Sequence, residues 1–358
     1  MKVLVLGGTG AIGSNLVRIL SENGVETTVT SRSYHANQSC VSYVLGNAKD
    51  NIFLRNLCAN SRWDAIVDFM SYKTDEFSVR LDLLLSNCKQ YVFISSSRVY
   101  ADKEHPIKET SPRLLDVNDD FSFLATDEYA LTKGRQENLL MNSTSRNYTI
   151  VRPYITYDKY RLQLGVLEKE EWLFRALQGH AVVFPHEMLN KVTTMTHGYD
   201  VALGIYKLLG KEDAIGEAYH ITVEQSNTWS EIIDIYKQGF KEATGKELKI
   251  HLVSIEDFLK CRAENLVWQV KYDRLFDRDF DVTKESQYVK SAEFSKAEIC
   301  LKQCLVAFIK DGSRFKNINM KYEAIKDRIT GELLKINTPP TASGIRQKLN
   351  YLLYRYIL

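Results

Sequence analysis

The stretch Val3-Leu4-Val5-Leu6-Gly7-Gly8-Thr9-Gly10-Ala11-Ile12-Gly13 decides the fold of this chain. Its first four residues form a short apolar run that predicts a buried strand. Apolar positions then recur at helical spacing from Ala11 to Leu20, and Asn23-Gly24 closes that helix. A glycine-rich turn that joins a first strand to a first helix predicts a dinucleotide-binding unit, in which the turn and the helix N-terminus hold a pyrophosphate.

Strands and helices continue to alternate through the first half of the chain. Further buried strands are expected at Glu26–Thr30, Ala65–Phe69, Tyr91–Ser95 and Tyr148–Val151, with a helix at Glu76–Leu85. Such alternation requires crossover connections, and these produce a parallel sheet covered on both faces. We therefore predict an α/β fold, a doubly wound parallel sheet (Rossmann) with a smaller α/β C-terminal substrate-binding lobe.

The pattern loosens after Arg152-Pro153, which indicates a second lobe. The tail after the break Thr338-Pro339-Pro340 is expected to form an amphipathic basic helix over Ile345–Leu358. For this tail, packing on its own domain or on a second subunit is favoured over a membrane surface. The predicted parts are a dinucleotide-binding domain at 1–158 with 192–212 packing back on it, a substrate-binding lobe at 159–338 and the tail at 339–358.

Composition excludes several classes of function. The formal net charge of the 358 residues is only +2, which gives no basic excess for nucleic-acid binding. No run approaches the about 20 apolar residues of a membrane span, and the N-terminal run meets glycine too early for a signal peptide. The six cysteines form no CxxC pair and do not cluster with histidine, so we expect no metal site, reduced thiols and a cytoplasmic protein.

Each glycine of the turn has an expected role. Gly7 allows the tight turn, Gly10 lets the backbone approach the pyrophosphate, and Gly13 lets the helix pack closely on the strand. The end of the second strand bears on the choice of cofactor. Ser31 stands where an acidic residue would bind the ribose of NAD, and Arg32 suits the 2′-phosphate of NADP. NADP is slightly favoured, although Arg32 could instead stack on adenine while NAD binds.

A tyrosine and a lysine four residues apart form the second motif. Tyr129 and Lys133 lie on one face of a predicted helix, so the ammonium can stabilise the phenolate that a tyrosine base requires. Upstream, Ser95-Ser96-Ser97 ends a predicted parallel strand, where ligands bind in open α/β sheets. A hydroxyl there can donate a hydrogen bond to a substrate oxygen that is oxidised or reduced.

With these motifs the sequence resembles the extended short-chain dehydrogenase/reductases, in particular their NAD(P)-dependent nucleotide-sugar epimerase/dehydratase group. The resemblance spans about the first 290 residues and aligns the catalytic hydroxyl with Ser96. It also covers Arg152-Pro153, which borders the nicotinamide in the family, Thr194–Val201 and Gly216–Ile221. The catalytic residues that it implies are Ser96, Tyr129 and Lys133. The cofactor contacts that it implies are Gly7, Thr9, Gly10, Ala11, Ile12, Gly13, Ser31, Arg32, Asn47, Phe69, Met70, Tyr129, Lys133 and Pro153.

The sequence departs from the family at three places. Ser97-Arg98 replaces the Asp-Glu pair of the 4,6-dehydratases, which disfavours that reaction. Gly46-Asn47 replaces a Gly-Asp, so Asn47 either bonds adenine or is a turn residue, and Tyr100-Ala101 replaces Tyr-Gly.

His197 is expected to be structural, at a helix entry near Asp200. The predicted substrate contacts are Ser97, Arg98, Tyr154, Arg161 and Arg274; for Arg161 and Arg274 a plain surface position is the alternative to a diphosphate clamp.

The resemblance implies an epimerase that acts on a nucleotide sugar through a transient keto intermediate, with Tyr129 as acid and base. The alternative within the family is an NADP-dependent nucleotide-sugar ketoreductase. An alternative of another class is a non-catalytic or RNA-binding relative, similar to chloroplast stem-loop RNA-binding proteins of this fold. A homodimer is also expected, through the helices around Ser78–Leu85 and Tyr129–Leu140.

Overall fold

The computed structural model describes residues 1–59, 61–290, 293–333 and 342–357. The chain divides into two compact units, and each is described by itself. Unit 1 comprises Met1–Thr156, Thr194–Ser226 and Arg278–Lys296, and unit 2 comprises Tyr157–Thr193, Asn227–Asp277 and Ala297–Leu358. The roles of these parts in dinucleotide and substrate binding stay predictions. The predicted boundary at 338 and the break at Thr338-Pro339-Pro340 lie outside the described residues.

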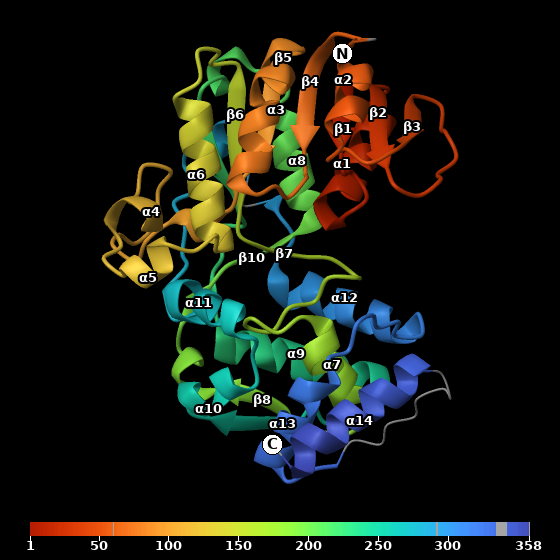
Figure 1. Cartoon of the computed structure of the whole chain (residues 1–358), viewed down its shortest axis with the longest axis vertical. Coiled ribbons are helices and arrows are strands. Elements are labelled where there is room, and N and C mark those ends of the chain that lie inside the picture. The colour runs from red at the N-terminus through yellow and green to blue at the C-terminus, as the bar shows by residue number, and fades with distance from the viewer. Residues whose placement is uncertain (60, 291–292, 334–341, 358) are drawn as a thin grey trace. The chain divides into compact units, whose positions relative to one another are not determined.

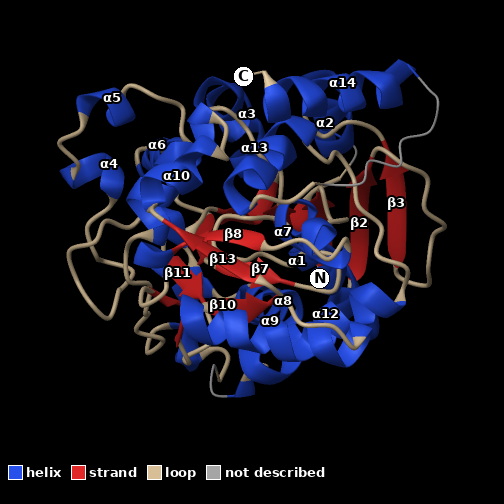
Figure 2. Cartoon of the chain, turned by 90° about the horizontal axis from the view of Figure 1, so that it is seen from below, coloured by secondary structure: helices blue, strands red, loops and turns tan. Residues whose placement is uncertain are grey.

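Unit 1 is built on a seven-stranded sheet with the order β11-β6-β5-β4-β1-β2-β3 (Figures 1 and 2). Every neighbouring pair in it is parallel. This arrangement confirms the predicted doubly wound parallel sheet. The strands are β1 (Lys2–Leu6), β2 (Glu26–Ser31), β3 (Val41–Leu45), β4 (Trp63–Asp68), β5 (Cys88–Ile94), β6 (Tyr148–Pro153) and β11 (Ala218–Ile221).

Two hydrophobic clusters cover the two faces of the sheet, because alternate side chains of a strand point to opposite faces. Val3 and Val5 of β1 pack in one cluster with α1 (Ala11–Glu22) and α8 (Gly198–Leu208). Leu4 and Leu6 pack in the other cluster with α2 (Asn51–Ala59), α3 (Thr74–Ser86) and α6 (Tyr129–Met141). Because the strands are parallel, all their carboxyl ends lie at one edge of the sheet, and the site described below lies at that edge.

Short elements complete unit 1. They are the 3-10 helices η1 (Ser97–Val99), η3 (Glu212–Ala214) and η6 (Glu285–Gln287), the helices α4 (Leu114–Val117) and α5 (Phe121–Leu124), and the strand β10 (Met195–His197). The strand β7 (Ile155–Tyr157) pairs with β10. His197 is the N-cap of α8, since its Nδ1 accepts a hydrogen bond from Tyr199 N at 3.3 Å. The expected structural role of His197 at a helix entry is confirmed.

Unit 2 is mainly helical and contains two short two-stranded sheets. In the first sheet β8 (Val182–Pro185) and β13 (Ile250–Val253) are parallel, and in the second β9 (Val192–Thr193) and β12 (Asn227–Thr228) are antiparallel. Within the described residues, no helix is long and apolar enough to cross a membrane. The helices are α7 (Lys169–Leu177), η2 (His186–Met188), α9 (Trp229–Thr244), α10 (Ile255–Lys260), η4 (Glu264–Leu266), α11 (Val267–Gln269), the π-helix η5 (Val270–Arg274), α12 (Ala297–Lys310), α13 (Met320–Thr330) and α14 (Ala342–Tyr356).

Candidate active site

The glycine turn lies between β1 and α1, and its glycines are required for different reasons. Gly7 has φ +73°, a left-handed conformation, and a Cβ there would lie 2.7 Å from Met70 Sδ. A Cβ on Gly13 would lie 2.8 Å from Gly8 Cα, so Gly13 allows α1 to pack directly on the turn. Neither position tolerates a side chain without movement of its surroundings.

Gly10 differs from the other glycines of the turn. Its φ of −85° is accessible to any residue, and a Cβ there would meet no atom within 4 Å. It is exposed and is the N-cap of α1, where no side chain caps the first amides at Ala11 and Ile12. Among the residues that the structure describes, nothing therefore requires glycine at position 10. An open helix N-terminus beside a position without a side chain fits the pyrophosphate of a dinucleotide.

The ends of β2 and β3 hold the residues predicted to select the cofactor. Ser31 is buried, and its Oγ accepts a hydrogen bond from Ser33 N at 3.1 Å. The side chain of Arg32 is exposed and has no hydrogen bond or ion pair within the described ranges. Asn47 Oδ1 accepts from Lys49 N at 3.1 Å, so that oxygen is engaged in its own turn. Arg32 is thus accessible to a phosphate, whereas Asn47 has the features of a turn residue.

The end of β4 lies against the glycine turn. Phe69 N donates to Leu6 O at 2.9 Å, and Met70 lies beside Gly7. The sequence did not single out Asp68, which is buried and accepts a hydrogen bond from Tyr91 Oη at 2.9 Å. Burial raises the pKa of Asp68, while hydrogen bonds from Met70 N and Tyr91 oppose the shift.

Tyr129 and Lys133 lie on α6, as their spacing predicts. Lys133 is buried, and its Nζ donates to Ile94 O, the last carbonyl of β5, at 2.7 Å. The same Nζ lies 5.9 Å from the centroid of the Tyr129 ring and 4.6 Å from that of Phe93. Tyr129 itself is 42% exposed. The ammonium is therefore fixed at the carboxyl end of β5, with the accessible phenol beside it.

The surroundings of Lys133 change the pKa of its ammonium group. Burial lowers the pKa of Lys133 to about 8, because an ammonium loses its hydration, while Asp68 and Glu137 act in the opposite direction. The lysine is thus still largely protonated at neutral pH. It can stabilise a phenolate at Tyr129 there.

Two of the three serines after β5 make structural hydrogen bonds. Ser95 Oγ donates to Glu137 Oε1 at 2.6 Å, and Ser97 Oγ donates to Arg152 O at 2.7 Å. Ser96 Oγ only accepts, from Arg98 N at 3.2 Å, and its proton has no acceptor within the residues described. Of the three hydroxyls, that of Ser96 is able to donate to a substrate oxygen.

Arg98 was expected to contact substrate, and the structure places it against Tyr129, the predicted acid and base. Its guanidinium carbon lies 5.3 Å from the Tyr129 ring centroid, and it forms an ion pair with Glu128. Glu128 also caps α6, since its Oε2 accepts from Ala130 N at 2.6 Å. The sequence analysis missed Glu128, although an acidic residue directly before a helix is an N-cap signal.

A buried ion network fixes α6 on the sheet. Arg152 of β6 donates to both carboxylate oxygens of Glu137 at 2.8 Å, and Arg113 Nη1 donates to Glu137 Oε2 at 3.1 Å. Burial would raise the pKa of Glu137, but Arg152 holds it below its usual value. Glu137 was also missed; it lies one turn after Lys133 on the same helix face, which was the available signal.

The remaining predicted residues lie in both units. In unit 1, Pro153 is buried at the end of β6, and the Tyr154 ring packs 5.5 Å from Phe280. In unit 2, the Arg161 side chain is exposed. Arg274 is 2% exposed, forms an ion pair with Asp273 and donates to Gly165 O at 3.0 Å. The surface alternative is wrong for Arg274, because its carboxylate and carbonyl partners allow the guanidinium to be buried.

A model of the family described as "NAD dependent epimerase/dehydratase family" matches residues 3–222. The chain belongs to this family. The match confirms the resemblance that Gly7, Tyr129 and Lys133 indicated.

Two curated relatives differ in what their names describe. A chloroplast stem-loop binding protein of 41 kDa b from Arabidopsis thaliana is 27% identical over 245 residues, which is 64% of this chain and 60% of that protein. A UDP-glucose 4-epimerase from Lactobacillus helveticus is 31% identical over 134 residues, 31% of this chain and 41% of that enzyme. The chain thus spans 60% or less of the length of these two relatives.

Solved structures share the fold along most of the chain. The epimerase Mth375 from Methanothermobacter thermautotrophicus has a TM-score of 0.66 at 18% identity, covering 91% of this chain and 94% of that one. A dTDP-glucose 4,6-dehydratase from Bacillus anthracis, solved with NAD, has a TM-score of 0.65 at 18% identity, covering 87% and 97%. At these identities the likeness concerns the fold.

Proposed function

We propose that this chain is an NAD(P)-dependent epimerase that acts on a nucleotide sugar through a transient keto intermediate, with Tyr129 as acid and base. One observation carries the proposal. The ammonium of Lys133 is fixed between Ile94 O and the Tyr129 ring, at the strand end where the Ser96 hydroxyl proton has no acceptor among the described residues. The family match and the open glycine turn support it.

The residues of the chain act on protons and on orientation. The cations of Lys133 and Arg98 stabilise Tyr129 as the phenolate, which takes the proton from the sugar hydroxyl and becomes the neutral phenol. Ser96 donates a hydrogen bond to the sugar oxygen and holds it near Tyr129. The bound nicotinamide dinucleotide supplies the acceptor for the hydride and its return. Tyr129 gives the proton back once the keto sugar presents its other face.

The pyrophosphate would be held at the turn by Gly7, Gly10 and the first amides of α1. Arg32, exposed at the end of β2, favours NADP slightly over NAD, because its guanidinium suits a 2′-phosphate. The NAD bound to the Bacillus anthracis structure belongs to that protein and does not decide the question here.

The test begins with the dinucleotide in the purified chain. The purified protein is denatured without any added cofactor, and the released small molecules are separated by chromatography. We expect them to include NADP or NAD. UDP-glucose, dTDP-glucose and UDP-glucuronic acid are then incubated without cofactor and followed by NMR. The expected product is an isomer of one of them. A reduced sugar that forms only when NADPH is supplied would favour the ketoreductase, and no conversion under either condition would refute both.

A second candidate function is binding of a structured nucleic acid. The Arabidopsis relative supports it, because that protein is a stem-loop binding protein. The near-neutral charge argues against a large phosphate-binding surface. Filter binding of an RNA hairpin at rising salt separates the two proposals. Nucleic-acid binding would be favoured over the epimerase if the native chain bound the hairpin tightly with a steep salt dependence and converted no sugar. Tyr129→Phe should then bind the hairpin equally well.

A further inference from the structure

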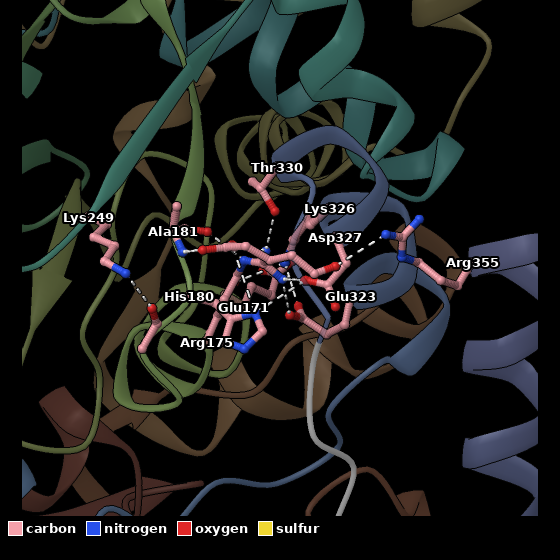
Figure 3. Close-up of polar contacts among 12 residues, drawn as sticks. Glu171, Arg175, His180, Ala181, Lys249, Glu323, Lys326, Asp327, Thr330 and Arg355 are labelled. Carbon is pink, nitrogen blue, oxygen red and sulfur yellow. Dashed lines mark hydrogen bonds and ion pairs between the residues drawn. The ribbon is translucent and has the colours of Figure 1, made fainter.

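The C-terminal helix α14 is fixed to unit 2 by a buried cluster of charged residues around Arg175, shown in Figure 3. Arg175 Nη1 lies 2.6 Å from Asp327 Oδ1 of α13, and Arg175 Nη2 lies 3.0 Å from Glu332 Oε2. Tyr351 of α14 is buried and donates its hydroxyl proton to the other oxygen of Asp327. The side of α14 that carries Tyr351 therefore faces the protein.

The same cluster contains a histidine and two carboxylates, which raises the question of a metal. Ligand atoms of His180, Asp327 and Glu332 lie within 4.8 Å of one another. However, Arg175 contacts both carboxylates, and Ala181 N donates to Glu332 at 3.0 Å. A guanidinium already neutralises these oxygens and would repel a cation, so the cluster is an anchor for α13 and α14.

The outward side of α14 carries large apolar side chains. Four of them recur at intervals of four, three and four residues, which places them in one stripe along the helix. A fifth, Leu353, lies at the edge of this stripe. All five are between 37% and 64% exposed, and they are Ile345, Leu349, Leu352, Leu353 and Tyr356. We call these five residues the α14 stripe.

Cations flank the α14 stripe on both sides. At about 100° per residue, Arg346 lies on one flank and Lys348 and Arg355 lie on the other. Arg346 and Lys348 are exposed, and Arg355 is partly buried. The sequence from Ala342 to Ile357 contains no Asp or Glu. Apart from these cations and the α14 stripe, the exposed residues include the neutral Gln347 and Asn350, so the exposed side of the helix carries positive charge and no negative charge.

We propose that α14 docks this chain peripherally on an anionic membrane surface. An apolar stripe bordered by Lys and Arg is the arrangement of a helix that lies in the lipid interface, where the stripe enters the acyl boundary and the cations meet lipid phosphates. A second copy of the chain is a poor occupant, because two α14 helices would bring together cations with no acidic residue to pair them.

The test is flotation of the purified full chain with lipid vesicles. The vesicles contain phosphatidylcholine alone or with about 30% phosphatidylglycerol. We expect the native chain to partition at least about 10-fold more strongly to the anionic vesicles, because each basic side chain near the surface contributes. Leu349→Glu with Leu352→Glu should reduce this binding at least about 10-fold by removing apolar insertion.

The matched control carries the same two charge changes at exposed apolar positions elsewhere, Ile52→Glu on α2 with Ile299→Glu on α12. It should retain the native partition within about 2-fold. Circular dichroism verifies that all variants fold. Equal binding of the native chain to both vesicle types, or an unchanged partition of the α14 variant, would overturn the proposal. A dimer in sedimentation that only the α14 variant abolishes would overturn it in favour of a second copy.

Discussion

The charge of a single buried lysine sets the alkaline limit of the proposed reaction. Lys133 loses its proton as the pH rises through about 8, since burial lowers its pKa to that value. The neutral amine no longer stabilises the Tyr129 phenolate. We therefore expect kcat/KM, which reports ionisations of the free protein, to fall on the alkaline side through about pH 8.

A pH profile of kcat/KM for native protein and for Lys133→Arg checks this expectation. A guanidinium stays protonated throughout that range, so the alkaline limb should move to higher pH in the variant even where its maximal rate is lower. An unchanged limb in Lys133→Arg would show that another group causes it.

Among single residues, those that motif spacing defines were predictable. Tyr129 and Lys133 lie on one helix face, and Ser96 lies at the end of β5, as the sequence indicated. Which side chains Arg98 and Ser95 pair with was not predictable, because these contacts join elements that are distant in sequence. Arg98 meets Glu128 across 30 positions, and Ser95 meets Glu137 across 42. Arg98 lies against Tyr129, and its predicted substrate contact stays a prediction.

At the glycine turn, two positions of one motif should respond differently to the same small change. Gly10→Ala adds a Cβ that meets no protein atom, so the free energy of unfolding should change by less than about 0.5 kcal/mol while dinucleotide affinity falls. Gly13→Ala adds a Cβ that lies 2.8 Å from Gly8 Cα, so it should lose about 1–3 kcal/mol of stability.

Denaturant unfolding and dinucleotide titration of both variants measure the two effects. If Gly10→Ala binds the dinucleotide as the native chain does, the proposed position of the pyrophosphate is wrong. Loss of stability in Gly10→Ala equal to that in Gly13→Ala would contradict the open geometry at Gly10.

Hydrophobic periodicity predicted some helices and strands well and missed others. The strongly apolar strands β1, β4, β5 and β6 and the helices α1 and α3 were predicted near their observed bounds. The strand β3 was not, since Val41–Leu45 is partly exposed at the sheet edge and has no continuous apolar run. The helix α13 was also missed, because its buried positions include charged residues such as Asp327 that periodicity treats as surface.

For unit 1 as a whole, stability should depend on pH through His220. Burial lowers the pKa of His220 to about 4, and its neutral ring bonds Asp281 O at 2.7 Å and Tyr100 Oη at 3.4 Å. Glu109 and Arg152 also face this site. The unfolded state binds the proton more tightly between pH 6.5 and 4, so the free energy of unfolding should fall by about 3 kcal/mol as the pH decreases through that window.

Urea unfolding at several pH values measures this dependence. His220→Gln retains a donor for Asp281 O and cannot titrate, so its stability should be lower at neutral pH but flatter over the same window. An equal slope in the native and variant chains would assign the effect to other groups.

The homodimer expected through α3 and α6 stays a prediction. Val79 on α3 is 66% exposed, which leaves an apolar side chain available for a partner. Sedimentation should show a dimer for the native chain and a shift toward monomer for Val79→Glu. A native chain that is monomeric at all concentrations would contradict it.

The rate of nucleotide-sugar conversion by Tyr129→Phe tests the central claim most directly. The substitution removes one oxygen from a 42% exposed side chain, so the fold and the dinucleotide content should be unchanged. If the Tyr129 hydroxyl carries the proton, conversion of the sugar should fall by about 10²–10⁴-fold. A variant that keeps the native rate with its dinucleotide bound would show that the chemistry takes place without this residue.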